Sequence, residues 1–173
     1  DFSKAFDKCE TNVLLHTLKE CGVMGRVGLW LAAFLDPNSR KQAVGVEGRV
    51  SSLVPVLSGV PQGTVLGPVL FLLHIRGISS SLSPGTQSSS FADDTRLQHG
   101  IESEQDCESL QQDLETMYCW AEDVGMEFNA GKFELLRFWP SREDAPDILY
   151  MAPDGSPIEE KESHRDLGGW SQY

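Results

Sequence analysis

Carboxylate side chains stand at two places in the sequence where they could take part in chemistry. Asp93 and Asp94 are adjacent and follow an apolar pair, while Asp1 and Asp7 bracket a seven-residue string at the N-terminus. Carboxylate oxygens are the ligands that Mg²⁺ prefers, so an adjacent Asp pair can form part of a metal site. Such a pair is more often a solvated turn, and the pair alone leaves both interpretations open.

A second candidate is the loop at residues 58–63, which is rich in glycine and proline and precedes an apolar run at 65–75. Its glycines permit a ligand to approach the backbone closely, and Pro61 stiffens the loop. If a helix follows, its N-terminus offers backbone N–H groups to a ligand. Taken alone, such a loop can equally be a simple turn.

Three strings occur in a fixed order: D-F-S-K-A-F-D at 1–7, S-G-V-P-Q-G-T-V-L-G-P at 58–68 and F-A-D-D at 91–94. Together they resemble motifs A, B and C of retroelement reverse transcriptases, and chance agreement over so many positions is remote. The sequence also resembles the LINE branch of non-LTR retrotransposons, with motif D at about 120–138 and motif E at about 164–170. The resemblance covers essentially the whole chain and is closest to elements of the jockey and chicken-repeat type.

This resemblance implies a catalytic centre that contains Asp1, Asp93 and Asp94. Nucleotidyl transfer of this type uses two ions, Mg²⁺ or Mn²⁺, which activate the primer 3′-hydroxyl and clamp the triphosphate. Asp1 and Asp93 are expected to bridge the ions, with Asp94 as the auxiliary ligand. Phe2 is expected to contribute only its backbone carbonyl. Two or three carboxylates plus substrate phosphates are enough for Mg²⁺.

The resemblance also assigns residues to the nucleotide besides Phe2. The Phe6 ring would lie beneath the incoming sugar and exclude a 2′-hydroxyl, although without the motif we would prefer core packing for this ring. Gln62 and Gly63 would touch the template strand and the nascent base pair. Lys132 would protonate the pyrophosphate leaving group as a general acid, whereas a lone Lys at a strand start is usually a solvated charge.

Asp7 stays outside the catalytic set. It lies at the start of the first helix, where an Asp N-cap is the simpler explanation.

The chain departs from the family pattern in two places. Arg76-Gly77 stands where Asn-Asp is common after motif B, and Gly169 stands where a β-branched residue would continue the motif E strand. Because the chain opens at Asp1, we expect an N-terminally truncated palm whose fingers, thumb and endonuclease are absent and which is inactive alone. An alternative stays open, namely a degenerate or domesticated fragment without catalysis that acts at most as an interaction domain.

Local patterns predict the elements that must position these residues. Apolar residues at helical spacing predict helices at 12–21, 27–35, 65–75 and 107–121. The last stripe spans about two heptads, too few for a coiled coil, so packing on a sheet is the better interpretation. Alternation predicts a hairpin from 42–46 and 50–56 around Glu47-Gly48, and strands at 132–138 and 148–151 with a turn at 153–155. The stretch 78–90 contains seven Ser residues and predicts a loop.

These elements indicate an α+β chain. The resemblance implies the right-hand polymerase palm, with a small antiparallel sheet that carries Asp1, Asp93 and Asp94 on one face and helices packed on the other.

Charge and composition add constraints on partners. The chain has 14 Lys and Arg against 26 Asp and Glu, and its net charge of -12 opposes contact with phosphate backbones. The resemblance nevertheless implies RNA-directed DNA synthesis in retrotransposition, with an RNA template, a DNA primer and deoxynucleoside triphosphates as partners. No apolar stretch is long enough to span a bilayer and no signal is evident, so we expect an intracellular monomer without a membrane partner, in the nucleus and cytoplasm for the parent element. The four Cys residues form no C-x-x-C and are expected to be reduced thiols, some of them buried.

Overall fold

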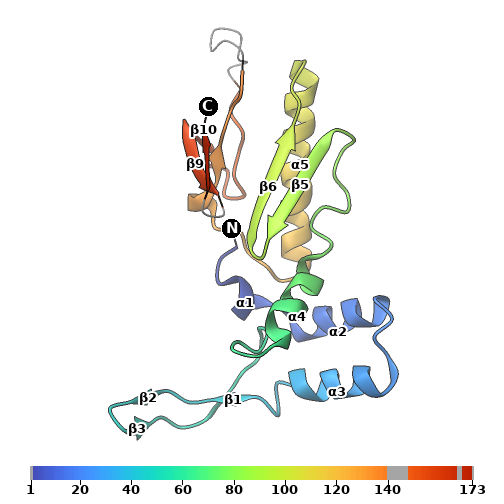
Figure 1. Ribbon diagram of the computed structural model, residues 1–173, viewed down its shortest axis with the longest axis vertical. Coiled ribbons are helices and arrows are strands. Elements are labelled where there is room, and N and C mark those ends of the chain that lie inside the picture. The colour runs from blue at the N-terminus through green and yellow to red at the C-terminus, as the bar shows by residue number, and fades with distance from the viewer. Residues whose placement is uncertain (1, 140–147, 167–168, 173) are drawn as a thin grey trace. The chain divides into compact units, whose positions relative to one another are not determined.

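The computed structural model describes residues 2–139, 148–166 and 169–172 of the chain (Figure 1). Contacts divide the chain into two units. Unit 2 comprises Lys4–Gly77 and Asp123–Met126, and unit 1 comprises Phe2 and Ser3 with Ile78–Glu122 and the described part of Glu127–Tyr173. Motif B therefore lies in unit 2 and motif C in unit 1.

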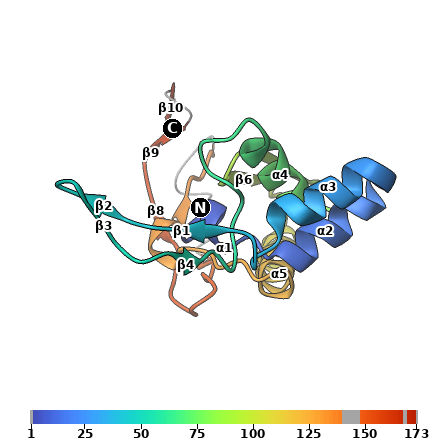
Figure 2. The ribbon, with the colours of Figure 1, turned by 90° about the horizontal axis from the view of Figure 1, so that it is seen from below.

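Unit 2 is built around helices, and the three predicted in this part of the chain are confirmed within two residues at each end. The helices are α1 (Ala5–Lys8), α2 (Thr11–Glu20), α3 (Gly25–Leu35) and α4 (Leu66–Ile75). Helix α2 packs against both α3 and α4, and Figure 2 shows α2 and α3 side by side. On these three helices the buried apolar side chains are Leu14, Leu18, Leu31, Leu35, Leu70, Phe71 and Ile75.

Helix α2 ends because Gly22 follows its last turn with a φ of 79°. The N–H of Gly22 donates to the Lys19 carbonyl, and the N–H of Val23 donates to the Leu18 carbonyl. This pair of bonds is the Schellman arrangement, which satisfies the last carbonyls of a helix and favours glycine at this position.

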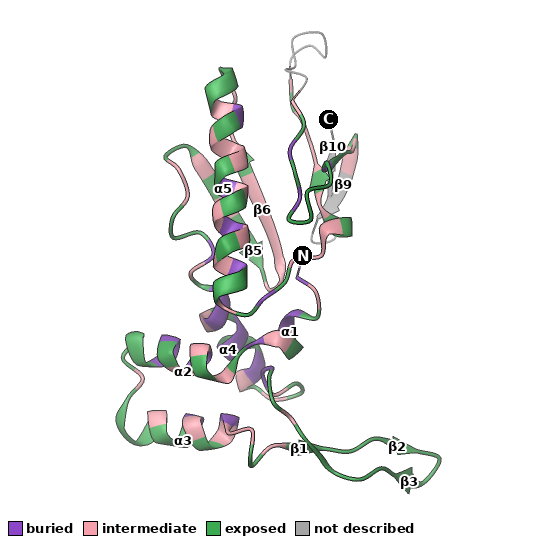
Figure 3. Cartoon of the chain, turned by 180° about the vertical axis from the view of Figure 1, so that it is seen from behind, coloured by how far each residue is buried: buried purple, intermediate pink, exposed green. Residues whose placement is uncertain are grey.

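The predicted hairpin between α3 and α4 is confirmed as a long two-stranded ribbon. Strand β1 (Lys41–Gln42) pairs with β4 (Val54–Pro55), and β2 (Gly45–Val46) pairs with β3 (Arg49–Val50). The turn residues Glu47 and Gly48 have φ values of 48° and 77°, as a type I′ hairpin turn requires. Every residue of the four strands is exposed, as the green ribbon in Figure 3 shows.

Unit 1 contains the hairpin that carries motif C. Strand β5 (Thr86–Phe91) pairs with β6 (Asp94–His99) in antiparallel register, from Thr86 opposite His99 to Phe91 opposite Asp94. The predicted loop at 78–90 is therefore wrong from Thr86 onward. Serine has little intrinsic tendency to form strands. The pairing with β6 outweighs this, because strand formation depends strongly on the neighbouring strand.

Helix α5 (Glu104–Asp123) matches the predicted stripe and extends it at both ends. Cys107 on α5 lies in a core cluster with Tyr150, Ala152 and Ile158, and Leu110 packs against the same cluster. In this cluster α5 packs on the segment 150–158, whereas packing on a sheet was expected.

The region after α5 departs from the prediction of long strands. Residues 130–132 form a short 3₁₀ helix, η1 (Ala130–Lys132), and only β7 (Glu134–Leu135) remains of the strand expected at 132–138. The reason is local. The N–H of Lys132 donates to the Asn129 carbonyl, and a group bonded within a turn cannot also pair with a neighbouring strand.

Of the strand expected at 148–151, only Met151 forms a ladder contact, opposite Pro157. The turn at 153–155 is confirmed, because the N–H of Gly155 donates to the Ala152 carbonyl at 2.9 Å. Two further pairs complete the unit, namely β7 with β8 (Glu159–Glu160), which is parallel, and β9 (Ser163–Asp166) with β10 (Gly169–Gln172). This last pair spans the two residues of motif E, 167 and 168, that lie outside the described part.

The α+β class is confirmed. Within the described residues the strands form five two-stranded ladders, four antiparallel and one parallel, in place of one small antiparallel sheet. Phe2 and Phe128 add an isolated antiparallel bridge. Across the described part of the chain, no helix has the length and apolar character that a membrane span demands.

Candidate active site

The tip of the motif C hairpin presents the adjacent carboxylates. Ala92 and Asp93 form the two-residue turn, and Asp94 is the first residue of β6, so the predicted place of Asp93 in a hairpin turn is confirmed. Ala92 has a φ of 52°, a value that costs energy in a residue with a β-carbon and that often marks functional sites. Asp93 and Asp94 are half-buried, and in the described part of the chain neither carboxylate is engaged in a hydrogen bond or an ion pair.

Free carboxylate oxygens at this tip suit a hard cation such as Mg²⁺, which prefers oxygen ligands. Among the described residues, no group of three or more His, Cys, Asp and Glu side chains is gathered as a metal site. Asp93 and Asp94 supply two carboxylates, and the third predicted ligand, Asp1, lies outside the described residues. The donor chemistry of Asp93 and Asp94 thus fits the metal that the sequence predicts.

Phe2, the predicted backbone ligand, is held by both its ring and its backbone. Phe2 as a whole is 4% exposed, and its ring stacks on that of Phe128 with centroids 4.4 Å apart. The neighbouring N–H of Ser3 donates to the Glu127 carbonyl at 2.7 Å. The side chain of Phe2 is therefore part of the core, and the role of its backbone carbonyl toward a metal stays a prediction.

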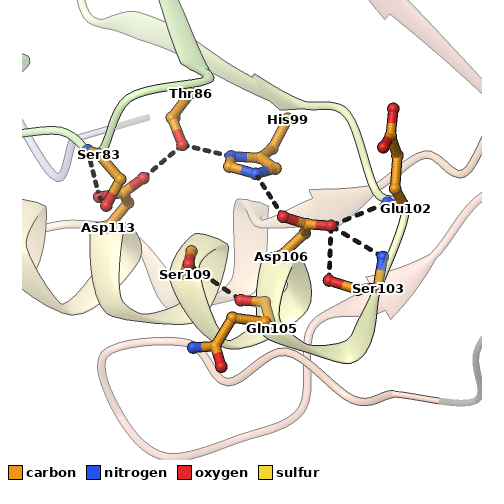
Figure 4. Close-up of polar contacts among 9 residues, drawn as sticks. All are labelled: Ser83, Thr86, His99, Glu102, Ser103, Gln105, Asp106, Ser109 and Asp113. Atoms are coloured by element: carbon orange, nitrogen blue, oxygen red, sulfur yellow. Dashed lines mark hydrogen bonds and ion pairs between the residues drawn. The ribbon is translucent and has the colours of Figure 1, made fainter.

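The other end of the motif C hairpin is fastened to α5 by Asp113 (Figure 4). Asp113 is 1% exposed and accepts hydrogen bonds from the N–H of Ser83 at 2.8 Å, from the hydroxyl of Ser83 at 2.9 Å and from the hydroxyl of Thr86. The Thr86 hydroxyl also lies 2.6 Å from Nδ1 of His99, the residue opposite it in the ladder. A buried carboxylate with three donors thus fixes the base of the hairpin to the helix.

Asp106 continues this network toward the start of α5 (Figure 4). Its Oδ1 lies 3.9 Å from Nε2 of His99, while its Oδ2 accepts from the backbone N–H groups of Glu102 and Ser103 and from the Ser103 hydroxyl. These hydrogen bonds, led by the Glu102 N–H, lower the pKa of Asp106. The Ser103-x-x-Asp106 spacing is that of a capping box, a sequence signal that could have located this helix start.

Sequence reasoning missed Asp113 as well. Asp113 lies three positions after Leu110 and four before Met117, so it falls on the apolar stripe of α5. A lone acid on a buried helical face needs hydrogen-bond partners, and this requirement is the signal that could have identified it.

In unit 2, the motif B loop is fastened to α1. The Ser58 hydroxyl donates to the Asp7 carbonyl at 2.8 Å, the Gly59 N–H to the Cys9 carbonyl at 2.8 Å and the Val60 N–H to the Phe6 carbonyl at 2.9 Å. Motifs A and B thereby interlock through three consecutive loop residues.

Asp7 also bonds to this loop through its side chain. Its Oδ1 accepts a hydrogen bond from Nε2 of Gln62 at 2.7 Å. The predicted N-cap role is wrong, because Asp7 lies inside α1, whose N-cap is Lys4, while the N-cap of α2 is Glu10. The carboxylate is directed to Gln62 instead, a contact between residues 55 positions apart that no local pattern reveals.

Phe6 and Gly63, the other residues of unit 2 that are predicted to bind the nucleotide, lie in α1 and in the motif B loop. The half-buried ring of Phe6 stacks on the fully buried ring of Phe71, with centroids 4.3 Å apart, so part of Phe6 does pack in the core. Gly63 is exposed, has a φ of 74° and has open space around its missing side chain. The roles of Phe6 and Gly63 toward a nucleotide stay predictions.

Lys132 is exposed at the end of η1 in unit 1, and its role as a general acid also stays a prediction. The structure thus brings Phe6, Asp7 and Gln62 together in unit 2. Phe2, Asp93, Asp94 and Lys132 belong to unit 1.

Residues 1–166 match the family described as reverse transcriptase (RNA-dependent DNA polymerase). The chain belongs to the reverse transcriptase family. Enzymes of this family generally use divalent metal ions and act on a nucleic-acid template and primer with nucleotide substrates.

Three similar proteins come from Drosophila melanogaster, and their names confirm the predicted resemblance to non-LTR retrotransposons. The RNA-directed DNA polymerase from mobile element jockey is 28% identical over 176 residues, covering 97% of this chain and 18% of that protein. A putative 115 kDa protein in the type-1 retrotransposable element R1DM is 34% identical over 97 residues, 56% of this chain and 9% of that protein. The probable RNA-directed DNA polymerase from transposon X-element is 28% identical over 152 residues, 86% of this chain and 16% of that protein. The chain spans less than a fifth of the length of each of these relatives.

Proposed function

We propose that this chain is the catalytic core of an RNA-directed DNA polymerase of a non-LTR retrotransposon. It joins deoxynucleotides to the 3′-hydroxyl of a DNA primer on an RNA template. The observation that carries the proposal is the motif C hairpin, whose tip presents the uncommitted carboxylates of Asp93 and Asp94 while its base is held by the buried Asp113.

Asp93 and Asp94, with Asp1 and the backbone carbonyl of Phe2, are the residues proposed to hold two Mg²⁺ or Mn²⁺ ions. When bound, these ions supply activation of the primer 3′-hydroxyl and neutralisation of charge on the triphosphate. Lys132 is the proposed proton donor to the pyrophosphate leaving group. Lys132 is an exposed residue at the end of η1.

Phe6 and Gln62 of unit 2 are proposed to select the substrate. Gly63, which follows Gln62, is proposed to contact the template strand. The Phe6 ring would exclude a ribose 2′-hydroxyl, and its stacking on Phe71 supports this role because a fixed ring discriminates better than a mobile one. Gln62 is proposed to meet the template strand and the nascent base pair. We propose a monomer that acts without a membrane partner, in the cytoplasm and nucleus of the host cell.

The test is primer extension on an RNA template with Mg²⁺ and with Mn²⁺. The chain replaces the corresponding segment of the jockey polymerase, and the resulting chimaera is compared with its Asp93→Asn variant. We expect Asn to lower extension by more than about a hundredfold, because the loss of one ligand charge removes several kcal/mol of transition-state stabilisation.

Asp123→Asn is the matched control, since Asp123 is an exposed Asp at the end of α5. It should extend as the unchanged chimaera does. Circular dichroism of each 173-residue variant should show an unchanged fold. Extension by Asp93→Asn within about threefold of the unchanged chimaera, a difference below 1 kcal/mol, would contradict the assignment.

A further inference from the structure

The Asp7–Gln62 hydrogen bond links a residue outside the predicted catalytic set to one that is proposed to meet the nucleic acid. The backbone of the loop is already fixed to α1 by the bonds of Ser58, Gly59 and Val60. Gln62 itself is exposed and is followed by Gly63, which has open space around it. The contact with Asp7 is therefore the interaction that restricts the side chain of Gln62, and it does not serve to hold the loop.

The chemistry of the two groups fixes the orientation of the Gln62 amide. A carboxylate has acceptors only, whereas an amide has an NH₂ donor at one end and a carbonyl acceptor at the other. Asp7 can accept only from Nε2, so the amide must turn its NH₂ toward α1. The other end, Oε1, then faces away from Asp7, and within the described residues it has no hydrogen-bond partner.

We propose that Asp7 is a positioning residue for Gln62, which it orients so that the amide presents a hydrogen-bond acceptor to the substrate. The proposal rests on the proposed polymerase function. If Asp7 orients Gln62 in this way, the substrate group opposite Gln62 must be a hydrogen-bond donor, such as a hydroxyl or an amino group. A free glutamine would offer donor and acceptor equally, so the orientation imposed by Asp7 adds selectivity without a new contact.

Asp7→Asn tests the orientation while it keeps shape and hydrogen-bonding capacity. An Asn side chain can pair with either end of the Gln62 amide, so the amide is no longer forced to one orientation. In the jockey chimaera we expect KM for the deoxynucleotide to rise about three- to tenfold, with kcat changed less, as expected for one hydrogen bond. Asp36→Asn is the matched control, because the Asp36 carboxylate also accepts hydrogen bonds from a loop of unit 2, from Asn38 and Ser39, and should leave KM unchanged.

The sharpest test exchanges the two groups. Gln62→Glu alone sets two carboxylates against each other and should raise KM more than Asp7→Asn does. When Asp7→Asn and Gln62→Glu are combined, the amide introduced on α1 can donate to the carboxylate introduced in the loop. The second oxygen of that carboxylate again offers an acceptor to the substrate. We expect the double variant to have a lower KM than Gln62→Glu alone, a rescue that a merely structural role for Asp7 does not predict.

Separate readouts distinguish the possible failures. If Gln62→Ala raises KM while Asp7→Asn does not, or if the exchange gives no rescue, the positioning role is overturned and the polymerase assignment stands. If the unchanged chimaera does not extend primers, the assignment fails. The orientation is then still measured by NMR of the 173-residue chain, in which the side-chain NH₂ of Gln62 should exchange with water more slowly than in Asp7→Asn. Equal exchange rates in the two chains would overturn the inference.

Discussion

A β-carbon on Gly59 would lie 2.8 Å from the Cα of Asp7. It would also lie 2.8 Å from the Phe6 carbonyl oxygen, and Gly59 has a φ of 86°. No side chain fits between the motif B loop and α1, because the neighbouring atoms belong to the backbone and cannot move aside cheaply. The contact between motifs A and B is therefore a contact between two backbones.

Gly59→Ala should destabilise the chain by about 2 to 5 kcal/mol, the sum of a left-handed conformation and an overpacked contact. Gly63→Ala is the matched control, since Gly63 has a similar φ of 74° but no heavy atom within 4 Å of the added carbon. It should cost only about 1 to 2 kcal/mol. Urea unfolding of both variants measures the difference in the free energy of unfolding. Equal decreases in the two variants would show that the close approach to Asp7 does not add to the cost of the β-carbon.

Phe6→Val should increase ribonucleotide incorporation far more than it changes deoxynucleotide use, because it removes only a steric block. Competition between the two nucleotides in primer extension by the jockey chimaera measures this ratio. Phe71→Leu removes the stacking partner of Phe6 but keeps the Phe6 ring, so it should raise ribonucleotide incorporation less than Phe6→Val does. If Phe6→Val lowers the use of both nucleotides equally, Phe6 acts only in packing.

Asp113→Ala should destabilise the chain by about 2 to 4 kcal/mol. The change leaves the N–H of Ser83 and the hydroxyls of Ser83 and Thr86, which are half-buried, without their acceptor. Asp123→Ala, at the exposed end of the same helix, should change stability by less than about 0.5 kcal/mol. Thermal unfolding compares the two, and hydrogen exchange should show faster opening of β5 and β6 in Asp113→Ala. Unchanged exchange there would mean that Asp113 does not hold the hairpin.

Stability should fall in mild acid because of His74 on α4. Its side chain is 2% exposed, and burial lowers its pKa below the ordinary value. The unfolded chain then binds protons more readily than the folded chain. Stability is full above the unfolded pKa of about 6.5 and is lost as pH falls from there through the folded pKa.

His74→Leu should remove most of this loss between pH 7.5 and 5. His16→Gln, in which the exposed His16 of α2 is replaced, should retain it. Urea midpoints at the two pH values provide the measurement. A His74→Leu variant that weakens as steeply as the unchanged chain would assign the pH dependence to other groups.

The parts of the fold that follow from local sequence were predictable. Helix α2 with its Gly22 stop, the stripe of α5 and the Glu47-Gly48 turn each depend on residues a few positions apart. Strand β5 was not predictable, because its serines form a strand only when β6 lies beside them.

The candidate site divides in the same way. Asp93 could be placed in a hairpin turn from motif C, whereas the pairing of Asp7 with Gln62 depends on a contact across 55 positions. Tertiary contacts of this kind decide which polar side chains meet, and periodicity within one element contains no information about them.

The exposed ribbon of β1 to β4 lies inside the loop that the Ser58–Asp7 bond closes, a loop of 51 positions. The entropy of closing such a loop grows only with the logarithm of its length, so doubling the loop costs only about 0.6 kcal/mol. Insertions or deletions at the ribbon tip should therefore change the free energy of folding only slightly, provided that Ser58, Gly59 and Val60 still contact α1. Related chains can differ widely in the length of this ribbon while the residues around Gln62 keep their positions.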